Sequence, residues 1–483
     1  MTSHASCERL RAIFSDIDGT VVHYKASLLS LGYEMVATTA AGDTSASIES
    51  GDIRPNLAPC PSVVWRHRES GRSVHCLEVP SATLGGGYIS RGTLKLVDDL
   101  RRLGVAFVLM TGARTSTFLS RLLSHTLPIC DYGVCEGGGR IWRLSEVVSM
   151  TDGVAPISAT PTTDGDGDLH VPVAFTQRTV ASTGTPRDLD QLGVCKLTLD
   201  TPWLDSMSTS AGNWRQQLAM DPASRVGRLW DVYRDLQALS ARSAADGASA
   251  PTWDHLVLKL DALSFATAFL VDVRPPPQSA KGCSSTEAAE AALKERFSRL
   301  YEPKYGCTVV MNLGKGHVAP AGSSKQSVTS HICALERWDP RIHCAALFDD
   351  ENDLEFAKLC GLGGYLPTIA HINVVAALVE RNAPTGGQTH GSGHWHRPAV
   401  EGLLGTEEAL TALLQRAREE TAQYGPLTER PAAREYSWRW NHPAAESSPL
   451  GASELVLAPR REGRVDTSRR LAPLWVGPIR YTV

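Results

Sequence analysis

Three short apolar segments constrain the fold of this chain more than any other feature of its sequence. They span residues 10–15, 105–110 and 343–348, and polar residues follow each of them directly or within a residue or two. Continuous apolar runs of this length are typical of strands that are buried on both faces of a parallel sheet. Helical patterns precede the second segment and follow the third, so strands and helices alternate. The sequence therefore predicts an α/β fold with a doubly wound parallel sheet, whose ligand site lies at the carboxyl ends of the strands.

The sequence contains signals for both ends of the helix that precedes the second apolar segment. Leu94, Val97 and Leu100 recur on one helical face. Ser90 has the residue type of an N-cap, and Gly104 has that of a C-terminal stop. A helix that leads directly into a strand in this way is the repeating unit of a parallel sheet.

The length of the chain favours more than one domain. Its 483 residues are 42% hydrophobic, which is enough to bury a large core. We expect a Rossmann-like α/β core at residues 8–155 and 312–417. The block between them, residues 156–311, interrupts the core and is predicted to form a separate α+β domain.

Two further segments do not follow the core pattern. Residues 25–88 form an insert in which two strand-like runs flank residues 69–72, which predicts a β-hairpin, and we expect loop in the rest of the insert. Residues 418–483 are rich in Pro, Arg and Glu and form a C-terminal extension. The extension is predicted to be either mobile or a strap that docks through its tryptophans, which are Trp438, Trp440 and Trp475.

Charge and cysteine usage exclude several classes of partner. The 48 Lys and Arg residues nearly balance the 52 Asp and Glu residues, so no global field attracts nucleic acid or an anionic membrane, and a small polar ligand is favoured. The 11 cysteines are scattered and never spaced as Cys-x-x-Cys, which indicates reduced thiols. The sequence has no uninterrupted apolar run of membrane-spanning length and no apolar stretch suited to a signal peptide near its start. We therefore expect a cytoplasmic protein.

Acidic residues follow the first and third apolar segments. Asp16 and Asp18 are two positions apart at the end of the first segment, so both carboxylates can project into one crevice, and Gly19 lets the chain turn sharply. In "FDDENDLEFA", Asp349 and Asp350 follow the third segment, and Asn352 and Asp353 open the next helix. Carboxylates that converge on one place repel each other unless a cation joins them.

Groups suited to an anion occupy the two other clusters. Thr111 and Gly112 follow the second apolar segment, where a hydroxyl and backbone amides at the start of a helix suit an anionic oxygen. Arg114 is either a substrate contact or an exposed helix residue. Ser323 has the residue type of an N-cap, and Lys325 lies in the first helical turn, where the helix dipole disfavours a lysine.

Each cluster has a purely structural explanation when it is taken alone. Asp-Gly-Thr can be a turn, Thr-Gly and Asp353 can cap helices, and Lys325 can be a solvated side chain. Their common position, at a strand end or a helix start, predicts one joint site.

Two other groups of potential metal ligands give a weaker prediction of a metal site. The sequence "TTDGDGDLH", residues 162–170, resembles half of a calcium loop but lacks the Gly at the sixth position and the Glu at the twelfth. A glycine-rich segment supplies three histidines at most and no helical frame for zinc; they are His390, His394 and His396. We expect a solvated turn in the first segment and a surface loop in the second.

The four clusters together resemble the motifs of the haloacid dehalogenase-like superfamily of aspartyl phosphatases. The matching residues, in motif order, are Asp16 with Asp18, Thr111, Lys325, and Asp349 with Asp353. The large block between the second and third motifs resembles the α/β cap of the Cof-type subgroup, which includes many sugar phosphatases. Residues 135–142 resemble the Glu-Asn-Gly-Gly stretch of that subgroup, with Gly137 in place of the Asn. The resemblance covers the core, while the insert, the detailed cap sequence and the extension have no such match.

This resemblance implies a magnesium-dependent phosphatase that acts on a small phosphorylated metabolite, such as a sugar phosphate. A phosphomonoester is doubly anionic, so a carboxylate attacks it only where cations neutralise the pair. Asp16 would be the nucleophile that becomes an aspartyl-phosphate, and Asp18 would protonate the leaving oxygen and then activate water.

The resemblance also implies the ligands of the metal and of the phosphate. Mg²⁺ would bind Asp16, the backbone carbonyl of Asp18 and Asp349, with Asp353 in support. The expected phosphate-binding residues are Thr111, Gly112, Lys325 and Asn352.

Two alternatives remain open at this point. One is a non-catalytic protein that binds phosphate esters or regulates through its insert or extension, although such a protein has no need of a general acid. The other is a phosphotransferase or mutase of the same superfamily, because transfer differs from hydrolysis only in which acceptor enters the site.

Overall fold

The computed structural model describes most of the chain, with several gaps. The described residues are 8–39, 62–79, 81, 86–123, 126–149, 162–163, 169–180, 186–212, 220–245, 257–263, 265–274, 286–312, 315–383, 393–427 and 436–437. The predictions for the centre of the 162–170 segment, for His390 and for the three tryptophans of the extension lie outside these residues. Of the described helices, none has both the length and the apolar character that crossing a membrane requires.

A parallel sheet forms the centre of the molecule and confirms the three predicted strands. β1 (Ala12–Asp16) lies between β7 (Ala106–Met110) and β17 (Cys344–Leu347), and it is parallel to both. β8 (Tyr132–Cys135) continues the parallel sheet beyond β7. On the other side, beyond β17, lie two short parallel strands, β18 (Gly364–Tyr365) and β19 (Trp395–His396).

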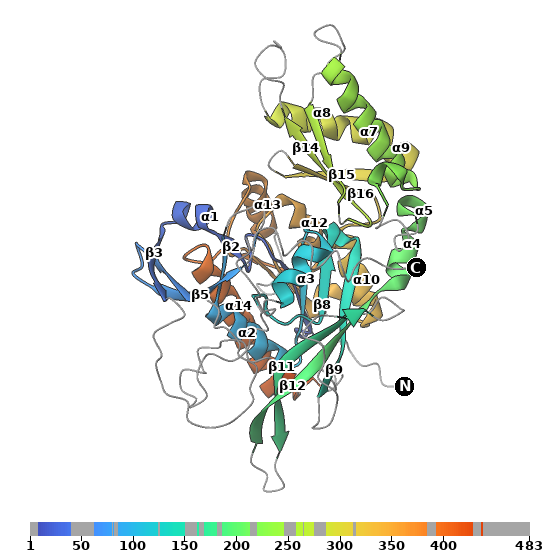
Figure 1. Ribbon diagram of the computed structural model, residues 1–483. Coiled ribbons are helices and arrows are strands. Elements are labelled where there is room, and N and C mark those ends of the chain that lie inside the picture. The colour runs from blue at the N-terminus through green and yellow to red at the C-terminus, as the bar shows by residue number, and fades with distance from the viewer. Residues whose placement is uncertain are drawn as a thin grey trace.

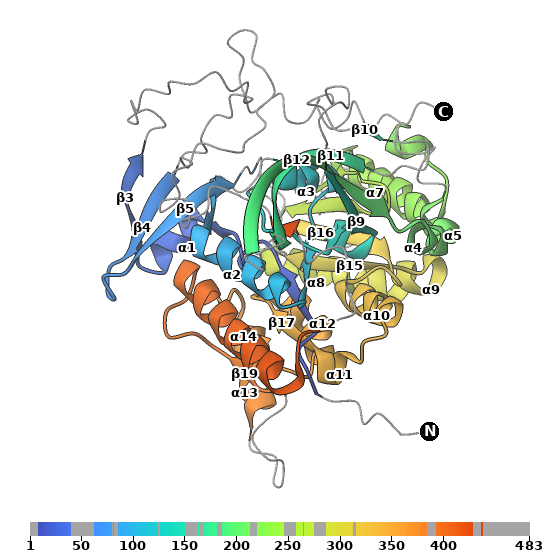
Figure 2. The ribbon, with the colours of Figure 1, turned by 90° about the horizontal axis from the view of Figure 1, so that it is seen from below.

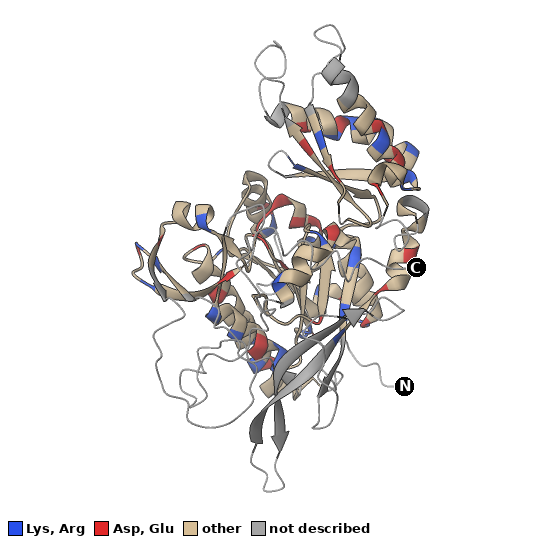
Figure 3. Ribbon diagram, in the orientation of Figure 1, with Lys and Arg blue, Asp and Glu red and all other residues tan. Residues whose placement is uncertain are grey.

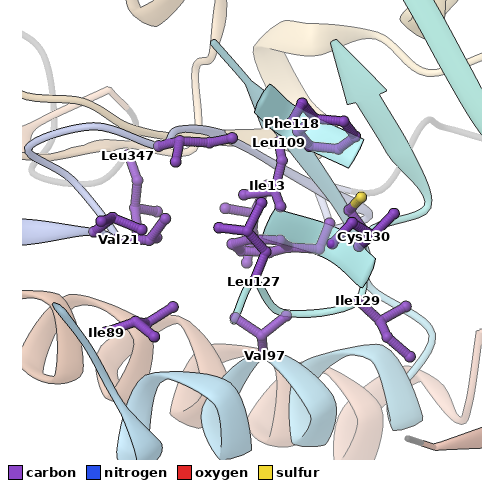
Figure 4. Close-up of a cluster of buried hydrophobic side chains, with 14 of the residues drawn as sticks. Ile13, Val21, Ile89, Val97, Leu109, Phe118, Leu127, Ile129, Cys130 and Leu347 are labelled. Atoms are coloured by element: carbon purple, nitrogen blue, oxygen red, sulfur yellow. The ribbon is translucent and has the colours of Figure 1, made fainter. Parts of the chain in front are cut away.

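Successive residues of β1 face opposite sides of this sheet, and a separate hydrophobic cluster buries each side. Ile13 belongs to the cluster beneath helices α2 (Arg91–Arg102) and α14 (Leu403–Tyr424), and Figure 4 shows it near Val97 of α2. Phe14 belongs to the cluster beneath the helices on the other side. Those helices are α10 (Lys325–Leu335), α12 (Leu354–Leu359) and α13 (Ile372–Asn382). The core is therefore doubly wound, as predicted.

The predicted ends of helix α2 are confirmed. The Ser90 hydroxyl accepts a hydrogen bond of 2.8 Å from the Thr93 amide, which is the contact of an N-cap. Gly104 follows the helix with φ of 87°, the left-handed conformation that favours glycine after a helix.

Antiparallel strands extend the same sheet beyond β8. β9 (Arg140–Ser149) is antiparallel to β8, and β12 (Pro186–Leu199) is antiparallel to β9. β11 (Leu169–Val180) then pairs with β12, and β10 (Thr162–Thr163) pairs with β11. The sequence reasoning assigned these strands from residue 156 onward to the inserted domain, because a strand pattern does not show which sheet a strand will join.

The inserted domain, called the cap below, has its own four-stranded antiparallel sheet. Its order is β13 (Val257–Asp261), β14 (Phe269–Arg274), β16 (Lys315–Pro320) and β15 (Cys307–Asn312). Helices α7 (Arg228–Ala245) and α8 (Thr286–Arg296) pack on this sheet through a third hydrophobic cluster, and Figure 1 shows the whole unit above the core. The cap sheet, as its strand pairing defines it, begins after β12 and ends at Pro320. These limits differ from the predicted limits of the inserted domain, 156 and 311, at both ends.

The insert forms a third sheet, which Figure 2 shows beside α14. β4 (Ser62–His67) and β5 (Ser73–Val79) form the predicted hairpin. The expectation of loop in the rest of the insert is wrong for β3 (Tyr33–Thr39), which pairs with β4. The sheet is completed by β2 (His23–Tyr24) and β6 (Gly87–Ser90).

Candidate active site

The predicted site residues meet at one edge of the central sheet, below the cap. Asp16 ends β1, Thr111 directly follows β7, and Asp349 lies two residues beyond β17. These three strands are neighbours and run parallel, so their carboxyl ends lie together. Lys325 begins helix α10, whose N-cap is Ser324 rather than Ser323 as predicted; the Ser324 hydroxyl accepts from the Ser327 amide.

Three carboxylates form a compact buried cluster. One oxygen from each of Asp16, Asp349 and Asp353 lies within 4.8 Å of the others, and the three residues are 6%, 5% and 1% exposed. Acidic side chains are almost never buried to this degree without a partner. Oδ2 of Asp353 is buried and has no hydrogen-bond partner among the described residues. Figure 3 shows acidic segments at this place, where the core faces the cap.

Lys325 supplies the positive charge of the cluster. Its ammonium group contacts Oδ1 of Asp16 and lies 2.5 Å from Oδ1 of Asp353. Burial lowers the pKa of Lys325, but the two carboxylates outweigh burial and raise this pKa above its usual value. One ammonium group cannot balance three carboxylates, so the cluster keeps a net negative charge if all three are ionised.

Two acids of the cluster, Asp16 and Asp349, have raised pKa values. Burial raises the pKa of Asp16 to about 8, against the opposing effect of Lys325. Burial and the charges of Asp16 and Asp353 likewise hold the pKa of Asp349 well above its usual value. Three buried acids this close together lower the stability of the fold, and such destabilising arrangements are typical of functional sites.

The cluster fits a divalent cation. It offers only oxygen atoms, which are the ligands that Mg²⁺ prefers, and one of them, Oδ2 of Asp353, lacks any other partner. The Thr20 hydroxyl donates a 3.1 Å hydrogen bond to Oδ1 of Asp349 and thereby orients that carboxylate. Gly19 leaves room for it: φ is 95°, and a Cβ there would lie 1.9 Å from Oδ2 of Asp349.

Asp18 stands apart from this cluster. Its Oδ1 accepts a hydrogen bond of 2.8 Å from Nη1 of Arg121 and another from the Tyr24 hydroxyl, while its Oδ2 accepts one of 3.2 Å from the Thr111 hydroxyl. Two nearby carboxylates of the same motif therefore have different surroundings, because Asp16 lies beside acids and Lys325 whereas Asp18 lies beside donors. Different surroundings suit different chemical roles.

Arg121 and Tyr24 are site residues that the sequence reasoning missed. Arg121 lies on α3 (Thr115–Leu123), 103 positions from Asp18, and Tyr24 ends β2 of the insert sheet. The only signal for Arg121 is a charged residue within the apolar run "FLSRLL", residues 118–123. No pattern in the sequence points to Tyr24.

Residues 111–114, called the phosphate loop below, have space beside them. The Thr111 hydroxyl accepts a 3.0 Å hydrogen bond from the Ala113 amide, which holds the turn. Gly112 is exposed, and nothing lies within 4 Å of the position that a Cβ would take. Arg114 forms an ion pair with Asp261 of the cap and lies over the ring of Phe265. It therefore bridges the two domains in addition to starting the turn into α3.

Asn352 is held by its own turn. Its amide donates a hydrogen bond of 3.4 Å to Asp350, and Asp350 in turn accepts from the Glu351 amide at 2.6 Å. The predicted contact between Asn352 and a phosphate stays a prediction. Asp353, which was expected to act only in support, contributes an oxygen to the cluster directly.

Comparison with known proteins gives similarity to solved structures only. No family model and no curated protein matches this chain. The sucrose-phosphatase of Synechocystis, solved with sucrose and phosphate, is 13% identical with a TM-score of 0.38, over 84% of this chain and 98% of that one. The C-terminal domain of trehalose-6-phosphate phosphatase from C. albicans is 12% identical with a TM-score of 0.34, over 85% and 93% of the two chains.

A third similar structure is a phosphatase of the haloalkanoate (HAD) enzyme superfamily from Bacteroides thetaiotaomicron. It is 11% identical with a TM-score of 0.31, over 86% of this chain and 98% of that one. This superfamily is the one that the four sequence motifs resemble. Similarity at such TM-scores adds no argument of its own, so the fold rests on the strand order and the site on its contacts.

Proposed function

We propose that the protein is a magnesium-dependent phosphatase that hydrolyses a small phosphorylated metabolite, with a sugar phosphate as the favoured class. The observation that carries the proposal is the cluster of three buried carboxylates and one lysine at the carboxyl ends of neighbouring strands. Such a cluster is costly to fold, and it acquires a use when a cation and an anionic phosphate complete it.

Asp16, Asp349 and Asp353 would hold Mg²⁺, together with the backbone carbonyl of Asp18. The bound ion would neutralise charge on the phosphoryl oxygens. Lys325, the Thr111 hydroxyl and the Gly112 amide would bind those oxygens as well, and Lys325 would exchange part of its contact with Asp16 for the phosphate. Asn352 would help to bind the phosphate if its turn opens toward the ligand.

The chemistry would then take two steps. A carboxylate oxygen of Asp16 attacks phosphorus, the bond from phosphorus to the leaving oxygen breaks, and Asp18 gives that oxygen its proton. In the second step Asp18 takes a proton from water, the water oxygen bonds to phosphorus, and inorganic phosphate leaves with Asp16 restored. Arg121 and Tyr24 hold the Asp18 carboxylate in place for both steps, while the Thr111 hydroxyl would exchange its hydrogen bond to Asp18 for one to the phosphate.

The cap would select the substrate. The strand pairing supports a cap at residues 201–320, inserted between the phosphate loop and Lys325. A domain in this position closes over a bound ligand and excludes water. A cytoplasmic location is part of the proposal, and it is supported by seven cysteines that are free and buried: Cys76, Cys130, Cys135, Cys307, Cys333, Cys344 and Cys360.

A panel of phosphorylated metabolites tests this function directly. Purified protein should release phosphate from one or a few of them in the presence of Mg²⁺, lose that activity in excess chelator and regain it with Mg²⁺ better than with Ca²⁺. Calcium coordinates more loosely and at longer distances, which spoils the alignment of the attacking oxygen. Full turnover in excess chelator would rule out the metal assignment, and binding without turnover across the panel would favour a non-catalytic protein.

A further inference from the structure

Glu136 is a buried acid that the proposed chemistry does not use. It begins η1 (Glu136–Gly138), the short turn that follows β8, and it is 0% exposed. Its φ is 55°, a value that a residue other than glycine adopts only when its surroundings enforce it. A buried carboxylate in a strained turn requires a physical explanation.

The carboxylate of Glu136 binds the cap. Its Oε2 accepts hydrogen bonds from the amides of Ala266 and Thr267 at 3.0 and 2.9 Å, and from the Thr267 hydroxyl at 2.9 Å. Residues 265–268, called the cap loop below, are the last part of the connection from β13 to β14. Three donors on one carboxylate oxygen make a strong contact, because hydrogen bonds to a charged group are stronger than neutral ones.

The backbone of the same turn binds the phosphate loop. The Glu136 amide donates to the carbonyl of Ala113 at 2.9 Å, and the Gly137 amide donates to that of Thr111 at 3.0 Å. Oε1 of Glu136 also accepts from the Thr115 hydroxyl, at 3.2 Å, at the start of α3. The turn is therefore attached to the phosphate loop on one side and to the cap loop on the other.

A second group holds the cap loop from within the cap. Arg225, which is 1% exposed, donates to the carbonyl of Phe265 at 2.8 Å. Glu136 thus takes the amides of this loop while Arg225 takes a carbonyl, so the loop backbone is fixed between a negative and a positive group. If the cap loop moved away, the buried carboxylate of Glu136 would lose three hydrogen-bond donors. Arg140, whose Nε lies 3.3 Å from Oε1 of Glu136, would remain beside it as a neighbouring charge.

From this arrangement we infer that Glu136 is a positioning residue that couples the phosphate loop to the cap. Binding of a phosphate at Thr111 and Gly112 steadies the turn at Glu136, and the turn steadies the cap loop through its hydrogen bonds to Ala266 and Thr267. The inference rests on the proposed function, since it takes the phosphate site as given. It assigns to the Glu-Gly-Gly stretch a role in communication between the domains rather than in the chemistry.

Hydrogen exchange with inorganic phosphate and Mg²⁺ as the probe tests the coupling. In the unaltered protein, phosphate should slow amide exchange in the phosphate loop and also in the cap loop. In Glu136→Gln, which keeps the size of the side chain but not its charge, the cap-loop amides should exchange about tenfold faster without ligand, and phosphate should slow only the phosphate loop. Glu336→Gln is the matched control, because Glu336 also pairs with an arginine, Arg143, and accepts a hydrogen bond from Tyr132, and neither of these partners belongs to the two loops.

Every outcome of this experiment either supports or overturns the coupling between the two loops. A cap loop that still responds to phosphate in Glu136→Gln, or a loss of response in the control as well, would overturn the coupling through Glu136. A phosphate loop that responds alone in the unaltered protein would overturn the inference and leave the proposed function intact. If neither loop responds there, the phosphate site is absent and both proposals fall. If Glu136→Gln does not fold, Thr267→Val decides: a reduced cap-loop response supports the coupling, and an unchanged one overturns it.

Discussion

Asp16 and Asp18 show how two residues of one motif come to lie in different surroundings. Asp16 lies among acids beside Lys325, whereas Asp18 accepts hydrogen bonds from Arg121, Tyr24 and Thr111. The sequence was sufficient to predict that Asp16, Asp349, Asp353 and Lys325 lie together, because each lies at a strand end or a helix start. It could not predict Arg121 or Tyr24, because their contacts to Asp18 depend on how α3 and the insert sheet pack.

The raised pKa of Asp16 predicts a pH dependence of metal binding. Without metal, burial raises the pKa of Asp16 to about 8, so near neutral pH this group is largely protonated. Mg²⁺ requires the carboxylate, so binding must release that proton below about pH 8. The affinity for Mg²⁺ should therefore rise with pH up to about pH 8, by about tenfold or more per pH unit, because Asp349, whose pKa is also raised, must be deprotonated as well.

Calorimetric titration with Mg²⁺ at several pH values, in buffers of different ionisation enthalpy, measures both the affinity and the protons released. Asp18→Asn is the matched control, and it should keep the pH dependence because it leaves Asp16 among the other acids. An affinity that does not change between pH 6 and pH 8 would contradict the role of Asp16 as a metal ligand with a raised pKa.

Removal of the lysine tests the phosphate contact. Lys325→Met should lower the rate by about a hundred- to a thousandfold, because one preorganised charge on the transferring phosphoryl group is lost. The contacts of Lys325 with Asp16 and Asp353 are also lost, so Mg²⁺ should bind at least as tightly as before. Steady-state kinetics and Mg²⁺ titration together check this, and a variant with unimpaired turnover would remove Lys325 from the site.

The turn after β1 is the element that most restricts the site. Gly19 has φ of 95°, and a Cβ there would overlap the Asp349 carboxylate at 1.9 Å. Gly71, in the turn of the insert hairpin, has φ of 67° with nothing within 4 Å of a Cβ position. The two glycines thus share backbone strain and differ in what surrounds them.

Gly19→Ala and Gly71→Ala separate these two effects. Each should destabilise the fold by about 1 kcal/mol or more through the left-handed backbone, as measured by denaturant unfolding. Only Gly19→Ala should also weaken Mg²⁺ binding, because it displaces Asp349. Equal Mg²⁺ affinity in the two variants would show that the Asp349 carboxylate does not have to occupy the place described here.

Elements were predictable to the extent that they carry local signals. The three central strands and helix α2 have continuous apolar runs or a capped amphipathic pattern, and they were predicted. β11 and β12 pair into the central sheet although the sequence placed them in the inserted block, because the pairing partner of an antiparallel strand is set by topology and not by its residues. β3 was missed because it lies in a segment whose other residues favour loop.

At the scale of the whole molecule, two units rest on the core near the site. The cap faces the carboxylate cluster and contacts the core through Arg114 with Asp261 and through Glu136 with the cap loop. The insert sheet contributes Tyr24 to Asp18 from another side. The site is therefore assembled from three parts of the chain that are far apart in sequence.

Changes in the cap should alter which substrate is used without stopping the chemistry. Phe265→Ala, in the cap loop, should change the ratio of kcat/KM for the best metabolite to that for p-nitrophenyl phosphate by about tenfold or more. Hydrolysis of the small aryl phosphate itself should survive, because the carboxylates and Lys325 belong to the core. Equal loss on both substrates in a folded variant would mean that the cap supplies chemistry rather than selection.

The central claim is that Asp16 is the nucleophile and Asp18 the proton carrier, and trapping of a phosphoenzyme tests it most directly. With an activated aryl phosphate the leaving oxygen needs little protonation, so Asp16 should still be phosphorylated in the Asp18→Asn variant. Hydrolysis of this adduct should be about a hundred- to ten-thousandfold slower than in the unaltered protein. Acid quenching and intact mass measurement should then show one added phosphate on Asp18→Asn and none on Asp16→Asn. An adduct on Asp16→Asn, or turnover by that variant, would contradict the account and favour direct attack by water.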